Sequence, residues 1–128
     1  MKAKPILIAA TIFYLFFAIG FLFIPVQLHA SLNVEANEVV KLMDRYFGSA
    51  LLALMVLSWF ARNYPDSKAR RLIIWANFIY LVLGLVTTTL GQFTVKPNAL
   101  NFGPIALHAI LVVLFGILIL KYRGPVKE

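Results

Sequence analysis

The sequence contains no cysteine. This absence excludes a disulfide, a thiolate nucleophile, a CxxC redox centre and a metal site with cysteine ligands. Acidic residues are also scarce: the chain has five Asp and Glu, and none lies well inside an apolar run. A small proton-coupled exporter needs a carboxylate at membrane depth, so the sequence argues against that class of protein.

Charged residues make up only 13% of the chain, whereas hydrophobic residues make up 62%. A soluble domain has about 25% charged residues. The apolar residues form four long runs, each close to the roughly 20 residues that a helix needs to cross a bilayer. We therefore predict an all-α polytopic membrane protein, in which residues 1–128 form a single up-and-down bundle of four transmembrane helices.

The predicted spans are residues 6–28, 44–61, 72–93 and 101–120. We interpret the first run as a retained helix, because it is about twice as long as the apolar core of a signal peptide. Leu28 also stands where signal cleavage requires a small residue.

Two boundaries remain open. An amphipathic segment, residues 34–43, precedes the second span and either continues into it or lies along the membrane surface. Asn33 is a predicted N-cap for that segment. The last helix begins either near Ala99 or at Pro104, because proline suits the first turn of a helix.

The basic residues are distributed unevenly between the two sides of the predicted spans. Nine of the twelve lie at the termini and in the loop between the second and third spans, and only Lys41, Arg45 and Lys96 lie on the other side. Basic loops resist translocation, so we predict that both termini are cytoplasmic, in a bacterial inner membrane. The basic residues flank apolar runs, which favours the lipid bilayer over nucleic acid as their partner.

Polar residues from the outer ends of all four spans, including His29 on the first, are predicted to converge in the outer half of the bundle. We predict a ligand pocket in which Arg45 attracts an anionic or carbonyl head group and His108 is a hydrogen-bond partner or proton carrier. Alternatively, Arg45 reaches lipid phosphates or pairs with an acid, and His108 bonds a backbone carbonyl. The predicted pocket residues are Arg45, Ser49, Thr88, Gln92, Asn101 and His108.

Three further features bear on this pocket. Tyr14 and Tyr80 lie nearer the membrane centre and are expected to close its bottom. Five phenylalanines of the first span are expected on an outer face, in contact with lipid, pigment or protein: Phe13, Phe16, Phe17, Phe21 and Phe23. No cofactor is predicted as the main interpretation, although a neutral His108 at membrane depth would also suit haem or chlorophyll ligation.

Residues 44–54, followed by residues 59–62, resemble the second-helix region of the DoxX-like superfamily. Its members are small four-helix membrane proteins with a recurring Arg-x-x-Gly motif, which corresponds here to Arg45 and Gly48. The resemblance implies the fold. Some members are linked to quinone or thiosulfate metabolism, and others are partners of larger membrane complexes.

Three functions are compatible with these features. The first is an accessory subunit of a larger membrane complex, because the chain has no soluble domain and no clear catalytic motif. The second is a binder or carrier of a small amphiphile, such as a quinone, an isoprenoid or an acyl lipid, in an outward-facing pocket. An intramembrane enzyme is the least favoured, because acid–base chemistry needs two titratable groups near the substrate. No catalytic residue and no metal ligand is predicted.

Overall fold

The computed structural model describes residues 2–31, 34–94 and 99–126, and the secondary structure in these ranges is entirely helical. The all-α prediction is therefore confirmed. In chain order the helices are α1 (Ala3–Phe23), α2 (Pro25–Ser31), α3 (Glu38–Ala61), α4 (Lys68–Thr94), the short 3-10 helix η1 (Ala99–Asn101) and α5 (Phe102–Lys121).

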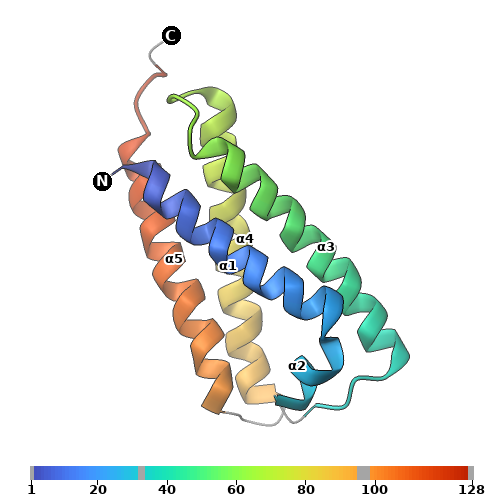
Figure 1. Ribbon diagram of the computed structural model, residues 1–128. Helices are drawn as coiled ribbons and strands as arrows, with labels where there is room; N and C mark the ends of the chain where they lie inside the picture. Colours follow the sequence, from blue (N-terminus) through green and yellow to red (C-terminus); the bar gives the residue numbers. More distant parts are fainter. Residues whose placement is uncertain (1, 32–33, 95–98, 127–128) are drawn as a thin grey trace.

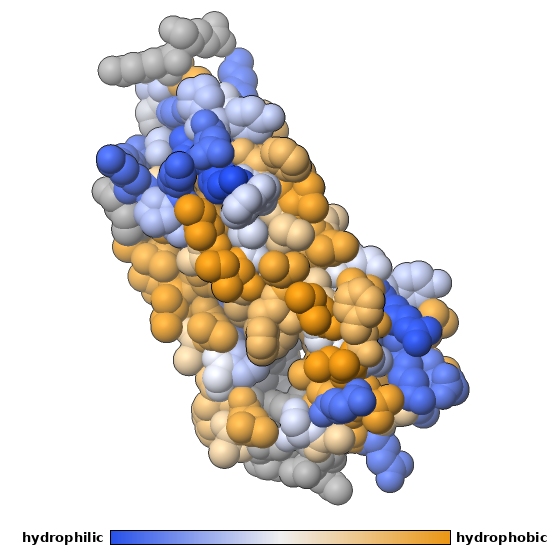
Figure 2. Space-filling model, in the orientation of Figure 1, coloured by the Kyte–Doolittle hydropathy of each residue, from blue (hydrophilic) through white to orange (hydrophobic). Residues whose placement is uncertain are grey.

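Among the described helices, α1, α4 and α5 are long and apolar enough to cross a membrane, by length and composition alone. Helix α3 has a comparable length of 24 residues, but its first turns carry charged side chains from Glu38 to Arg45. The space-filling view agrees with this distribution: hydrophilic residues gather at the two ends of the molecule, and hydrophobic residues cover its middle (Figure 2).

The predicted first span, residues 6–28, is in fact two helices. Helix α1 ends at Phe23, and α2 begins at Pro25 after a break at Ile24. Proline has no N–H to donate and disfavours a helical conformation in the residue before it, so the apolar run cannot continue as one straight helix. Figure 1 shows α2 turning away from α1 at the end of the bundle opposite both termini.

The amphipathic segment before the second span is part of that helix. Residues 38–43 form the first turns of α3, which continues without a break to Ala61. The side chain of Asn37 caps the helix, because its Oδ1 accepts a hydrogen bond from the backbone N–H of Val40 at 2.9 Å. The predicted cap, Asn33, lies outside the described residues. Helix α5 begins at Phe102, between the two predicted starts, with Pro104 in its first turn.

The helices pack as two pairs, α1 with α3 and α4 with α5. The first pair meets at Gly48, where an added Cβ would lie 2.8 Å from Cγ of Leu22 and 3.2 Å from the backbone oxygen of Ala18. Only glycine permits this approach. Small residues at helix contacts are the usual means by which membrane helices pack, since lipid is as apolar as leucine.

A buried hydrogen bond connects the two pairs near the end where the termini lie. Ser58 Oγ, on α3, donates to Oδ1 of Asn77 on α4 at 3.1 Å, and Asn77 Nδ2 donates to the carbonyl oxygen of Ile73 at 2.8 Å. Towards α2 the pairs diverge, and Figure 1 shows α3 inclined away from α4 and α5. The two helix pairs are therefore hydrogen-bonded to each other at the end where the termini lie, and they are separated at the α2 end.

Candidate ligand-binding site

A cavity of about 560 Å³ lies between the two helix pairs at the α2 end of the bundle. This volume falls in the range of small-molecule sites, about 300–1,000 Å³. All five α helices contribute to it. Its lining residues are Phe13, Phe17, Phe21, Leu28, His29, Val34, Phe47, Leu51, Tyr80, Leu83, Gly84, Thr87, Thr88, Gly91, Pro104 and His108.

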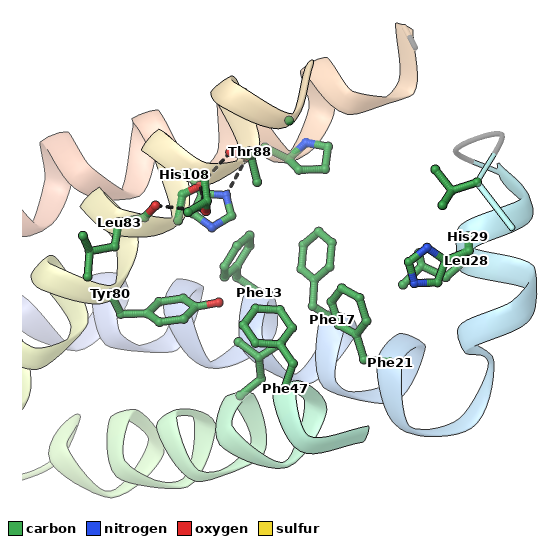
Figure 3. A pocket seen from close by; sticks show the side chains of 16 residues that line it. Phe13, Phe17, Phe21, Leu28, His29, Phe47, Tyr80, Leu83, Thr88 and His108 are labelled. Carbon is green, nitrogen blue, oxygen red and sulfur yellow. Dashed lines mark hydrogen bonds between the residues drawn. The ribbon is translucent and has the colours of Figure 1, made fainter. Parts of the chain in front are cut away.

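Phenylalanine rings form one wall of this pocket (Figure 3). Phe13, Phe17 and Phe21 of α1 recur every fourth residue, so they share one face of the helix. The ring centroids of Phe13 and Phe17 lie 4.9 Å apart, and those of Phe21 and Phe47 lie 5.0 Å apart. The prediction that these three residues lie on an outer face is therefore wrong. Phe16 and Phe23 do lie outside, with 70% and 75% of their surface exposed.

His108 forms the polar end of the pocket. Its Nδ1 lies 2.8 Å from the carbonyl oxygen of Pro104, one helical turn earlier. Because a carbonyl can only accept, Nδ1 carries the proton, and in the neutral ring Nε2 is then an acceptor. Nε2 has no hydrogen-bond partner among the described residues. His108 is 6% exposed and lines the pocket, so a ligand there is the partner that Nε2 can reach.

Gly84 fixes the position of this imidazole. A Cβ added at Gly84 would lie 2.5 Å from Nε2 and 2.6 Å from Cδ2 of His108, but 3.6 Å from Cε1. The nearly equal first two distances show that α4 contacts the Nε2–Cδ2 edge of the ring. The lone pair of Nε2 bisects the outer angle between Cδ2 and Cε1, so it does not point straight at Gly84. Both residues line the pocket.

Tyr80 supplies a second polar group close to His108. The ring centroids of the two residues lie 6.4 Å apart. Figure 3 shows the hydroxyl of Tyr80 pointing into the pocket. No hydrogen bond to the Tyr80 hydroxyl is found within the described ranges. Tyr14, the other tyrosine expected at the bottom, packs against Tyr80 at 5.4 Å between centroids and is fully buried, so Tyr80 alone of the two faces the ligand space.

The opposite end of the pocket is closed by α2. His29 Nε2 lies 2.7 Å from Oδ2 of Asp44, which joins α2 to α3. Figure 3 shows His29 and His108 at opposite ends of the pocket, with Phe13, Phe17 and Phe21 between them. The two imidazoles are therefore not placed to ligate one haem iron from its two sides. The described residues contain no group of three or more His, Cys, Asp or Glu side chains that would hold a metal ion.

The pocket is open on the side where α3 and α4 lie apart. Phe47, Leu83 and Thr87 line it and are also exposed on the outer surface. The hydroxyl of Thr87 bonds carbonyls of its own helix, as does that of Thr88, which donates to Gly84 at 2.7 Å. Along the opening, the side chains therefore present an apolar surface.

Residues 8–125 match a protein family described as a domain of unknown function, DUF8292. The chain belongs to this family. No curated protein and no solved structure matches the chain. The whole lining of the pocket falls inside the matched DUF8292 segment. The match does not connect the chain to the DoxX-like superfamily, so that resemblance stays a prediction.

In this DUF8292 protein, the six residues predicted for the pocket lie in different places. Thr88 and His108 line it. Gln92 is buried on α4 but is not a lining residue. The side chain of Asn101 lies outside the described part of the chain.

Arg45 and Ser49 are exposed on α3 and lie outside the lining. They are four residues apart, and Ser49 Oγ donates to the carbonyl oxygen of Arg45 at 2.8 Å. Successive helical residues differ by about 100° in direction. Asp44 and Gly48, one position earlier on each turn, are buried against α1 and α2, so Arg45 and Ser49 turn away from them.

The sequence predicts Tyr80 at the bottom of the pocket and His29 at the same end of the bundle, but it does not predict the phenylalanines as a set. The fourfold spacing of Phe13, Phe17 and Phe21 was the available signal, because it indicates a single continuous helix face. The sequence did not show that His29 would bond Asp44, because Pro25 changes the direction of the chain just before His29.

Proposed function

We propose that this protein is a four-span membrane protein that binds a small amphiphile between its helix pairs. One observation carries the proposal: an apolar, aromatic-walled pocket ends on two polar groups, His108 Nε2 and the Tyr80 hydroxyl, that lack hydrogen-bond partners among the described residues. Few precisely placed polar groups in an otherwise apolar pocket are typical of small-molecule sites.

Helix α3 is the fourth span in this proposal. Its 24 residues are about 36 Å long, enough to cross a hydrocarbon core of about 30 Å. It also packs along α1, which is itself apolar enough to span. Its charged first turns would then lie at one membrane surface, next to α2.

The orientation follows from the charges. Both termini and the α3–α4 connection lie at one end of the bundle (Figure 1). The basic residues of that end include Lys4, Arg62, Lys68 and Arg71. The positive-inside rule places this end in the cytoplasm, of a bacterial inner membrane in our proposal. The pocket then lies in the outer half of the membrane and opens sideways to lipid between α3 and α4.

The test is to purify the protein in a mild detergent and identify retained small molecules by native mass spectrometry. Gly91 lines the pocket, and a Cβ added there would meet nothing within 4 Å. Gly91→Phe is therefore expected to fill the pocket and abolish retention. Gly103→Phe is the matched control, because Gly103 is equally open but lies outside the lining.

Equal retention by the two variants would refute the pocket as the binding site. If the wild-type protein instead carries a stoichiometric larger membrane protein and no small molecule, the chain is an accessory subunit. An isolated protein that converts its bound molecule would favour the third function, an intramembrane enzyme.

A further inference from the structure

We infer that the pocket selects apolar molecules that end in a neutral hydroxyl group, and rejects the matching carboxylates and phosphates. This inference rests on the proposed function, because it specifies the ligand of the same pocket. It follows from the charges around the pocket and from the direction of the hydrogen bonds at its polar end.

No lysine or arginine lines the pocket within the described residues. Arg45, the basic residue predicted to attract an anionic head group, is exposed on the far side of α3. A charged group that does contact the lining is instead an acid: Asp44 lies 2.7 Å from the lining residue His29. An anion in this pocket would lose its hydration without gaining a lysine or arginine partner, which is strongly unfavourable.

The hydrogen bond from His108 Nδ1 to Pro104 determines what the head group must supply. It leaves Nε2 as a lone-pair acceptor, so the ligand has to donate a proton to it. Ketones, esters and ethers have no such proton. Tyr80, on the facing helix, carries a hydroxyl that can donate to the ligand oxygen. A hydroxyl oxygen is both donor and acceptor, so one alcohol group satisfies both side chains at once.

A ligand without the hydroxyl proton would leave a buried acceptor unpaired. Sites built to bond a ligand hydroxyl discriminate strongly against analogues that lack it, because their own polar groups are then desolvated without compensation. The aromatic wall, by contrast, contacts the apolar body of the ligand and does not distinguish between head groups.

The experiment compares three probes with the same apolar body: farnesol, farnesyl methyl ether and farnesoic acid. Full-length protein in lipid nanodiscs is equilibrated with radiolabelled farnesol at pH 7, and the other two probes compete for it. We expect the ether to bind about tenfold more weakly than the alcohol, the effect of one buried hydrogen bond. The acid is expected to bind more weakly still.

Two variants separate the roles of the polar groups. His108→Phe keeps a ring in place but removes the hydrogen-bond acceptor. It should therefore lower the affinity for farnesol to that for the ether, and leave the affinity for the ether unchanged. Tyr80→Phe removes only the hydroxyl, which can donate a hydrogen bond to the oxygen of the alcohol or of the ether. It should therefore weaken the binding of both probes. The comparison of probes on the wild-type protein does not depend on the folding of any variant.

Equal binding of the alcohol, the ether and the acid, or tighter binding of the acid, would overturn the inference while leaving an amphiphile pocket in place. Binding of all three that is also insensitive to Gly91→Phe would overturn the proposed pocket itself. No binding of any probe would count against both.

Discussion

Gly84 and His108 contact each other so closely that a Cβ at Gly84 would lie 2.5 Å from Nε2 of the imidazole. This contact joins α4 to α5 and determines the position of the polar end of the pocket. A glycine in the middle of a helix costs about 0.5–1 kcal/mol relative to alanine. Here the missing side chain leaves the space in which the His108 ring lies.

Gly84→Ala should therefore displace His108. The added methyl group would overlap the ring edge, and such overpacking typically costs about 1–3 kcal/mol. We expect a lower unfolding midpoint and weaker binding of farnesol in nanodiscs. Gly103→Ala, on α5, is the control, since its Cβ would meet nothing within 4 Å and Gly103 lies outside the lining. If both variants behave alike, the Gly84–His108 contact does not position the imidazole.

Removing the hydroxyl of Ser58 should destabilise the contact between α3 and α4. Ser58→Ala deletes the buried hydrogen bond to Asn77, so Oδ1 of Asn77 loses the hydrogen bond from Ser58. Side-chain hydrogen bonds between membrane helices contribute about 0.6 kcal/mol on average and at most about 1.7 kcal/mol. We expect a loss of stability in that range, measured by unfolding in mixed micelles with increasing dodecyl sulfate.

Ser49→Ala is the matched control for this measurement. Both serines lie on α3, but the Ser49 hydroxyl bonds a carbonyl of its own helix and is exposed. Its removal should change stability little. A loss as large as that of Ser58→Ala would show that the contact between α3 and α4 is not the source of the effect.

The acid stability of the loop between α3 and α4 should depend on Asp66. Arg71 donates hydrogen bonds to both carboxylate oxygens, at 2.8 Å and 2.6 Å, and its positive charge adds to their effect, so the pKa of Asp66 is lowered. The folded-state pKa is thus below the unfolded one, and the contribution to stability is complete above the unfolded value. It is lost as the pH falls through the folded value.

We therefore expect Asp66→Asn to lower the thermal unfolding midpoint at pH 7. The difference from wild type should narrow below the ordinary aspartate value of about 3.9 and then vanish. Thermal unfolding in detergent from pH 7 to pH 3 measures it. A difference that does not change with pH would mean that the ionised carboxylate is not what stabilises the loop.

The absence of cysteine makes the proposed topology directly testable. Single cysteines in place of the exposed residues Glu35 and Asn63 flank α3 on its two sides. In intact bacteria, a membrane-impermeant maleimide should label Glu35→Cys, and it should label Asn63→Cys only after the cells are opened. The reverse pattern would invert the orientation. Labelling of both in intact cells would show that α3 does not cross the membrane.

The helical segments could be predicted because each depends on local sequence alone. Long apolar runs require helices in lipid, where backbone groups can bond only within the chain. The break at Pro25 was also readable from the sequence, and ignoring it produced the wrong single helix over residues 6–28. In the Arg45-x-x-Gly48 pattern, Gly48 packs against α1, whereas Arg45 is exposed and outside the pocket.

By itself, the sequence determined that the described residues are helical, closely where α3, α4 and α5 end, and how unevenly the basic residues are distributed along the chain. Only the tertiary structure decided which side chains meet. His108 and Tyr80 lie on different helices, as do His29 and Asp44, and their approach depends on how two helix pairs cross and diverge. Helix rotation is fixed by close contacts such as those at Gly48 and Gly84, which couple residues that no local pattern connects.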